Sequence, residues 1–140
     1  MYPNPLKAYH SVNKTTMPGK ETEAAVLNQA AVRLTKSIQS WSNTPEQQRA
    51  LDDALRYNQR IWTIFQGELA NEENPLPKKL RLDLLQLSAF IDRRTFEVMA
   101  FPDPAKVTIL IDINNNIAAG LRTTTPEPAT TQMAQSSAVA

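Results

Sequence analysis

Hydrophobic residues recur at intervals of three and four along four long stretches of the chain, each of which lies between prolines. This spacing places side chains on one face of an α-helix, which has about 3.6 residues per turn. Proline suits the first turn of a helix and interrupts its interior, because it has no amide proton to donate. The pattern therefore predicts helices over about 18–41, 45–70, 77–99 and 104–122.

Two of these helices have clear start signals. Thr44 is a favourable N-cap residue, with Pro45 at the first helical position and Gln47 three residues after the cap. Asp103 precedes Pro104 in the same way. The β-branched segment 107–113 could also form a strand. We expect a helix there, since the spacing continues to Leu121 and no other segment offers a partner strand.

Short connections between long helices favour antiparallel neighbours, so the sequence predicts an all-α fold, an up-and-down antiparallel four-helix bundle over residues 18–122. Residues 1–17 contain large apolar side chains and are expected to form an ordered, non-helical arm. Residues 123–140 are rich in Pro, Thr, Ala and Ser, and are expected to be disordered. Asn58 and Asn114 are polar residues on apolar stripes, and we expect them to fix the register of the bundle by hydrogen bonding across its core.

Composition restricts the possible chemistry. The 140 residues fit one domain, and 15 Lys and Arg against 14 Asp and Glu give no general attraction to nucleic acid. With no cysteine, one histidine and three glycines, the chain has no basis for thiol catalysis, a histidine-rich metal site or a phosphate-binding loop. We therefore expect no enzyme activity, no metal and no cofactor. No apolar run could span a membrane and the start lacks a signal peptide's apolar core, so a cytoplasmic location is expected.

The stretch 77–99 carries more apolar residues than one core-facing stripe requires. Exposed apolar patches usually mark a binding site for a protein partner. Alternatively, this helix is the central one and its neighbours and the N-terminal arm bury it on both sides. The residues left over after the core stripe is assigned are the candidates for a partner-binding groove: Leu82, Leu85, Phe90 and Phe96.

The same helix also carries basic residues, which could contact RNA. Acidic residues at Asp83, Asp92 and Glu97 interleave with them, which favours ion pairs along a solvated face. The candidate RNA contacts are Lys78, Arg81, Arg93 and Arg94.

Three segments carry a family resemblance, namely 58–65 (NQRIWTIF), 74–77 (NPLP) and 90–96 (FIDRRTF). In their order and spacing the chain resembles the FlaF family of flagellar biosynthesis regulators over roughly residues 1–122. The opening, with 4–9 (NPLKAY) and 16–19 (TMPG), is also similar to that of the flagellin chaperone FliS. The FlaF resemblance implies a small cytoplasmic protein that promotes flagellin synthesis and filament assembly, with or against the regulator FlbT.

The FliS likeness implies a mechanism, in which a helical bundle binds the terminal helices of unpolymerised flagellin. It makes the apolar surface of the second and third helices the candidate groove, which adds Ile61, and it makes Tyr2, Leu6 and Tyr9 a candidate displaceable cap. The alternative is a post-transcriptional regulator that acts on flagellin mRNA, directly or in complex with FlbT.

Overall fold

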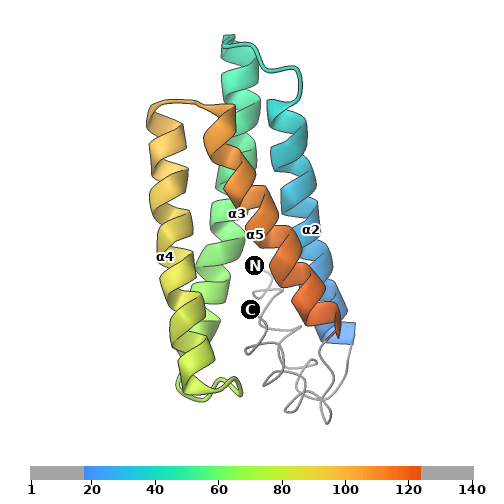
Figure 1. Cartoon of the computed structure of the whole chain (residues 1–140), viewed down its shortest axis with the longest axis vertical. Helices are drawn as coiled ribbons and strands as arrows, with labels where there is room; N and C mark the ends of the chain where they lie inside the picture. Colours follow the sequence, from blue (N-terminus) through green and yellow to red (C-terminus); the bar gives the residue numbers. More distant parts are fainter. Residues whose placement is uncertain (1–17, 124–140) are drawn as a thin grey trace, which may run out of the picture.

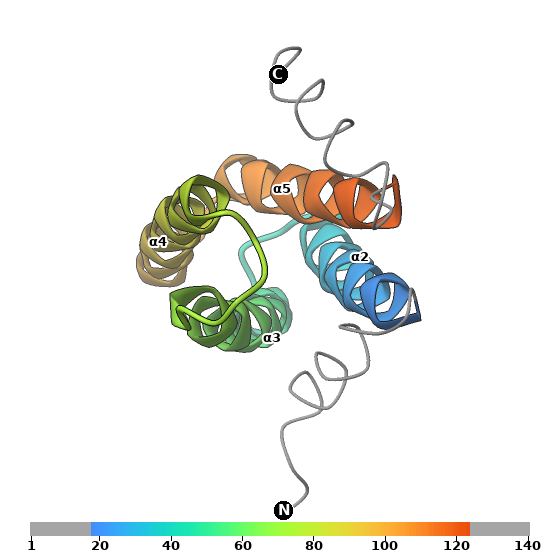
Figure 2. The same cartoon turned by 90° about the horizontal axis from the view of Figure 1, so that it is seen from below.

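The computed structural model describes residues 18–123, which form four α-helices and no strand. Their bounds are α2 Pro18–Ile38, α3 Pro45–Ala70, α4 Lys78–Ala100 and α5 Pro104–Thr123. Consecutive helices run in opposite directions (Figure 1). Seen from the end, they follow one another around the bundle in chain order, so that α5 returns to the side of α2 (Figure 2). The all-helical prediction is confirmed for this part of the chain.

The four helices do not pack equally. α2 packs most extensively against α5, α3 packs against both α2 and α4, and α4 contacts α5 only sparsely. The reason is visible in Figure 1, where α5 slants across the bundle from the top of α4 to the lower end of α2. α4 is therefore an edge helix among residues 18–123, and its helical neighbours there do not bury it on both sides. Burial of this helix by the N-terminal arm lies outside the described residues.

The core consists of buried apolar side chains from all four helices. Trp62 is the largest of them and is 1% exposed, and its ring meets that of Phe65 edge to face, with 5.6 Å between the centroids. The other large apolar side chains that are fully buried are Leu27, Leu34, Leu51, Leu55, Ile91, Val98, Val107 and Leu110. Burial of these side chains is the main force that holds the helices together.

A polar cluster lies within this core. The Asn114 side-chain nitrogen on α5 donates a hydrogen bond to the Asn58 side-chain oxygen on α3, at 2.7 Å, and a longer one to the backbone carbonyl of Leu27 on α2, at 3.3 Å. The indole nitrogen of Trp62 donates to the Asn114 side-chain oxygen at 3.0 Å. The predicted hydrogen bonding of the two asparagines across the core is confirmed, and the cluster as a whole joins α2, α3 and α5.

The capping residues act as the sequence indicates. The Thr44 hydroxyl accepts a hydrogen bond from the Gln47 amide at 3.2 Å, and Pro45 begins α3. The Gln47 side chain in turn accepts from the Ser42 amide at 2.7 Å. At the start of α5 the Asp103 carboxylate accepts from the Ala105 amide at 3.0 Å. Segment 107–113 is helical, so the strand alternative is wrong.

The predicted ends of the helices need small changes. The first helix ends at Ile38, three residues earlier than expected, because the chain turns at Ser40, whose φ is 52°. The third begins at Lys78, after Pro77 in an extended conformation. Thr123 is the last residue of α5. The expected N-terminal arm over 1–17 and the disordered tail after 123 lie outside the described residues.

Candidate docking surface

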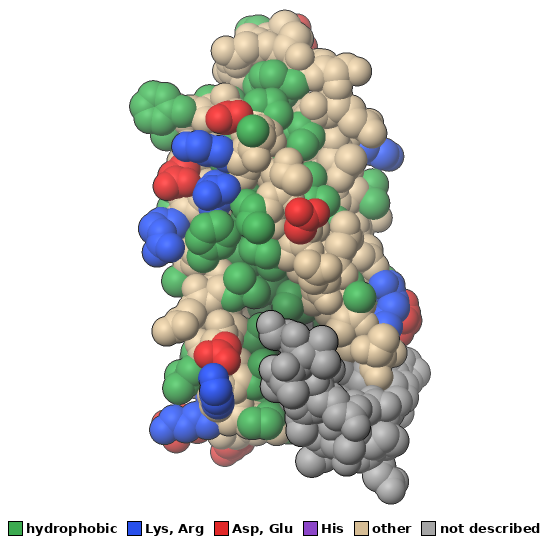
Figure 3. Space-filling view, viewed as in Figure 1, with side chains coloured by type: hydrophobic (Ala, Val, Ile, Leu, Met, Phe, Trp, Pro, Cys, Tyr) green, Lys and Arg blue, Asp and Glu red, His purple; other side chains and the backbone are tan. Residues whose placement is uncertain are grey.

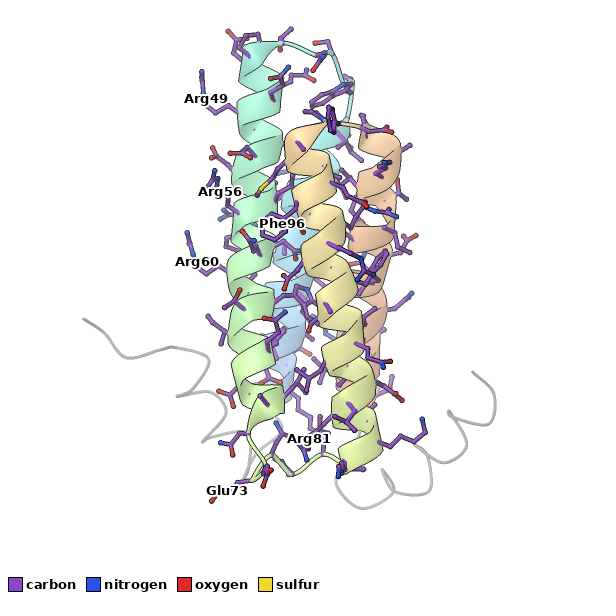
Figure 4. The ribbon with its side chains drawn as sticks, turned by 90° about the vertical axis from the view of Figure 1, so that its left-hand side faces the viewer. Arg49, Arg56, Arg60, Glu73, Arg81 and Phe96 are labelled. Carbon is purple, nitrogen blue, oxygen red and sulfur yellow. The ribbon has the colours of Figure 1, made fainter. Side chains whose placement is uncertain are left out.

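The outer face of α4 carries the two large apolar side chains that this helix exposes. Leu82 is 48% exposed and Phe96 is 59% exposed. They are fourteen residues apart, with the exposed Ala89 midway, so they follow one line along the helix over about 21 Å. Phe96 lies between α3 and α4 on the side of the molecule that Figure 4 shows. We call Leu82, Ala89 and Phe96 the α4 outer stripe.

The other residues of the predicted groove lie elsewhere. Phe90 and Leu85 are half-buried, and Phe90 packs against the core with the Arg94 guanidinium 5.1 Å from its ring centroid. Ile61 is 5% exposed and belongs to the core, so its assignment to a surface groove is wrong in this bundle. α3 buries a wide arc that includes both Ile61 and Trp62, and adjacent residues can share such an arc. The five candidates therefore do not line one groove.

A second apolar strip follows the boundary between α4 and α5 (Figure 3). On these two helices half-buried side chains, among them Leu87, Phe90 and Ile117, pack against the core. They are part of the core's outer layer. The α4 outer stripe differs from them because Leu82 and Phe96 leave about half or more of their surface uncovered.

Two of the four candidate RNA contacts are engaged within the protein. One guanidinium nitrogen of Arg81 donates to the carbonyl oxygens of Leu69 and Asn71 at the end of α3, at 3.0 and 3.4 Å. Arg94 pairs with Glu97 at 3.0 Å and donates to the carbonyl of Lys106 on α5 at 3.1 Å. Lys79, next in sequence to the candidates, pairs with Asp83. Most basic residues of α4 therefore donate to backbone carbonyls of the neighbouring helices or form ion pairs within α4.

Lys78 and Arg93, the other two candidates, are exposed. Neither makes an ion pair within residues 18–123. The four candidates thus separate into two engaged side chains and two that face solvent, and the structure does not bring them together as one basic patch.

A hollow of about 400 Å³, open to solvent, lies between the start of α3 and the end of α4. Leu51, Leu55 and Val98 lie at its floor, but they are almost fully buried and so present little apolar surface to it. The remaining lining residues are Pro45, Gln48, Arg49, Asp52, Met99 and Pro102. Just beyond the last turn of α4, Phe101 is 79% exposed.

The family model described as flagellar protein FlaF matches residues 5–121, which is most of the chain and includes nearly all of the four helices. The chain belongs to the FlaF family. No curated protein and no solved structure shows significant similarity to it. The family resemblance read from the sequence is confirmed, and it makes this a flagellum-related protein with a helical bundle fold.

Two further findings describe this FlaF-family chain. None of the helices in the part that the structure describes is long and apolar enough to cross a membrane. Within the same residues, no three His, Cys, Asp or Glu side chains gather as they would to hold a metal ion. The predicted cap residues Tyr2, Leu6 and Tyr9 lie outside residues 18–123, so the structure does not test them.

Sequence reasoning missed the hollow and the exposed Phe101. A phenylalanine between a helix end and a proline was a usable signal, because Pro102 prevents that helix from continuing and leaves Phe101 in the connection. The hollow gave no such signal. It forms where side chains of α3 and α4 that are far apart in sequence come together, and its lining alternates apolar and polar residues.

Proposed function

We propose that this FlaF-family protein is a cytoplasmic chaperone that binds unpolymerised flagellin before export and so promotes flagellin synthesis and filament assembly. The observation that carries the proposal is the α4 outer stripe, on an edge helix that its neighbours leave uncovered. Membership of a flagellar protein family supports flagellin as the partner. An amphipathic client helix could cover the stripe with its own apolar face.

The driving force for such binding is burial of apolar surface. Each Å² of apolar surface removed from water contributes about 25 cal/mol, and the cost of ordering the client is subtracted from the total. Phe96 and Leu82, about 21 Å apart, suit a client helix that lies along α4 for about four turns. This mechanism needs no catalytic residue, metal or cofactor, and the proposal assigns none.

The proposal is tested by purifying the chain together with the flagellin of the same bacterium, full length and without its terminal helices, followed by size-exclusion chromatography. We expect a stable complex with full-length flagellin that is lost on truncation. Leu82→Glu and Phe96→Glu should each weaken the complex at least tenfold, since each places a charge where the client buries apolar surface. Gln29→Glu is the matched control, because it adds the same charge at an exposed position of α2, which does not pack extensively against α4.

Circular dichroism separates binding from folding in these variants. We expect all three to keep the helicity and thermal transition of the parent protein. Loss of helicity in Leu82→Glu or Phe96→Glu would show that these side chains support the fold, and no complex with either flagellin would refute the proposal.

The alternative function is post-transcriptional control of flagellin mRNA, alone or with FlbT. The exposed Lys78 and Arg93 favour it, whereas the engagement of Arg81 and Arg94 within the protein leaves few free basic residues for phosphate. Direct RNA binding should weaken steeply with salt. A shift of flagellin leader RNA at physiological salt that Lys78→Glu and Arg93→Glu abolish would favour this alternative.

A further inference from the structure

The α4 outer stripe is symmetric about its middle residue. Leu82 lies seven residues before Ala89 and Phe96 lies seven residues after it, and all three are exposed. A second copy of α4 that runs antiparallel to the first, centred on Ala89, would place Leu82 of each copy opposite Phe96 of the other. In a two-fold symmetric interface each contact occurs twice, so both large apolar side chains of each copy would be covered. The stripe is therefore complementary to itself.

A second helix can approach this face closely. In the end view, α4 lies at one corner of the bundle, and no helix of residues 18–123 lies on its outer side (Figure 2). The axes of packed helices are about 8–10 Å apart, and the distance depends on the side chains at the contact. Ala89 puts a small side chain at the centre of the contact, with the larger ones about 10 Å to either side.

Polar side chains beside the stripe match in the same arrangement. Lys79 lies ten residues before Ala89 and Glu97 eight residues after it, so at about 100° per residue both lie on the same side of the stripe. Lys79 of one copy would therefore lie beside Glu97 of the other, offset by about 3 Å along the helix axis. Gln86 and Arg93 oppose each other in the same way. A parallel pair would instead place each charge beside its own like, so the charges favour the antiparallel pair.

The ion pairs within α4 do not prevent this contact. Lys79 pairs with Asp83 at 3.2 Å, and Glu97 pairs with Arg94 at 3.0 Å. Exposed pairs of this kind contribute little to stability, so a charge from a second copy can share or replace either partner at small cost.

The size of the contact indicates a weak and reversible dimer. α4 has 23 residues, so its outer face is about 34 Å long and, at about 10 Å across, offers roughly 700 Å² when two copies are counted. Stable protein interfaces bury about 1,200–2,000 Å² in total. A pair of α4 faces therefore suits an association that forms at high protein concentration and that a client covering more surface would displace.

We propose that α4 is a self-association surface, on which a second copy of this chain docks antiparallel about a two-fold axis at Ala89. The symmetry of the stripe and the match of Lys79 with Glu97 identify the occupant as this chain itself. The inference goes beyond the proposed function, because it gives the α4 outer stripe a second partner and makes the dimer and the flagellin complex mutually exclusive. The dimer covers the apolar stripe while no client is bound.

Sedimentation equilibrium of the full chain measures the association. We expect the average mass to rise with concentration from 15.7 kDa toward twice that value, with a dissociation constant on the order of 10–100 µM. Ala89→Glu should weaken the dimer at least tenfold, because it places two like charges at the axis. Gln29→Glu, at an exposed position of α2, is the matched control and should dimerise as the parent does. A monomer at about 1 mM protein, or a dimer that Ala89→Glu leaves unchanged, would overturn the inference.

Exchange of charges tests the predicted register. Lys79→Glu and Glu97→Lys should each weaken the dimer severalfold, since each places like charges side by side across the axis. The double variant K79E/E97K makes the neighbours unlike again and should recover most of the parent affinity. A double variant that dimerises no better than the single ones would contradict this register.

Engineered thiols test the antiparallel direction, because the chain has no cysteine. Ala89→Cys should form an intermolecular disulfide under mild oxidation, since residues that face each other at the axis lie within the roughly 4.4–6.8 Å between Cα atoms that a disulfide spans. Leu82→Cys and Phe96→Cys should cross-link poorly alone and readily when mixed, because each position faces the other. Efficient cross-linking of Leu82→Cys alone would indicate a parallel pair and overturn the inference.

The Ala89→Cys cross-link also separates this inference from the proposed function. Saturating full-length flagellin should suppress it, because both partners cover α4. If the chain dimerises but flagellin does not bind, the chaperone function is refuted and the dimer stands. If flagellin binds but the chain stays monomeric, the dimer is refuted and the chaperone function stands. A cross-link that persists while flagellin is bound would refute the sharing of α4 by the two partners.

Discussion

Asn114 is the residue that joins the most elements inside the bundle. It lies on α5, its side chain is fully buried, and its three hydrogen bonds reach α2 and α3. The Asn58 amide nitrogen, by contrast, is buried and has no hydrogen-bond partner among the described residues. Buried polar groups without partners destabilise a fold, and the Asn58 nitrogen is one such group. The three hydrogen bonds of the cluster all involve Asn114.

We expect Asn114→Ala to lower the free energy of unfolding by about 2–3 kcal/mol, because it removes the partner of both Trp62 and Asn58 in a buried site. Urea denaturation measures this change. Asn115→Ala is the control, since Asn115 is exposed and its hydrogen bond to Asn28 lies at the surface. It should cost less than about 0.5 kcal/mol. Equal losses in the two variants would contradict the importance of the buried cluster.

Glu23 gives the protein a pH-dependent stability. The pKa of its carboxyl group is raised from 4.5 to about 7, mainly by burial and also by the nearby Glu68, while Lys20 partly opposes the shift. Because the folded-state pKa exceeds the unfolded value, the folded protein binds this proton more tightly. The contribution of Glu23 to stability is therefore fully present below about pH 4.5 and is lost as the pH rises through about 7.

We expect Glu23→Gln to raise the free energy of unfolding at pH 8 by about 1 kcal/mol, a value reduced for partial exposure to solvent, and to change little near pH 5. Thermal unfolding at the two pH values measures the difference. Glu72→Gln, at an exposed position in the α3–α4 connection, should have no such pH dependence. A gain of the same size at pH 5 would show that Glu23 does not titrate in this way.

At the scale of helices, the sequence specified where elements begin better than which of their faces are covered. Thr44 and Asp103 could be identified as caps because capping depends on residues within one turn. The burial of Ile61 could not be predicted in the same way, since it depends on how α3 is rotated against α2 and α4. For the same reason the sequence indicated excess apolar residues on α4, but did not separate the exposed Leu82 and Phe96 from the half-buried Phe90.

The connection between α3 and α4 depends on a contact from outside α3. No basic residue lies in the last turn of α3, and Arg81 of α4 binds the carbonyls of Leu69 and Asn71 instead. We expect Arg81→Met to lower the free energy of unfolding by about 1–2 kcal/mol, because it leaves these carbonyls without a charged donor. Amide hydrogen exchange should accelerate over residues 69–78.

Lys79→Met is the control for this prediction. Lys79 lies in the same turn of α4, but its side chain is 88% exposed and pairs only with Asp83. Exposed pairs of this kind contribute little to stability, so exchange over residues 69–78 should remain as in the parent protein. Similar exchange in the two variants would mean that Arg81 does not hold the connection.

At the scale of the whole molecule, the slant of α5 makes the bundle asymmetric. The two most extensive helix pairings in the bundle, α2 with α5 and α2 with α3, both involve α2. α4 packs mainly against α3. Two of the four buried residues of α4, Ser88 and Thr95, are polar and bond to carbonyls of their own helix. Sequence patterns predicted four helices and their order, but this unequal packing arises from crossing angles, which depend on side-chain contacts between helices.

We expect the amides of α4 to exchange with solvent faster than those of α2 and α5, because less apolar surface holds α4 in place. Native-state hydrogen exchange at low denaturant concentration measures this order. Because the amides of α4 and α5 are measured in the same sample, α5 serves as the internal control. Equal protection of all four helices would show that the bundle opens only as a unit.

The pairing of α2 with α5 also has a consequence for how the chain folds. These helices are the first and the last of the described residues, and they meet at one end of the bundle, where Arg122 pairs with Glu21 at 2.9 Å. The most extensive contact thus joins the segments that are farthest apart in sequence, and a chain must close a long loop to form it. A growing chain at the ribosome can complete α2, α3 and α4 while the main partner of α2 is still unmade, so the core that α2 to α5 share is complete only when α5 has been synthesised.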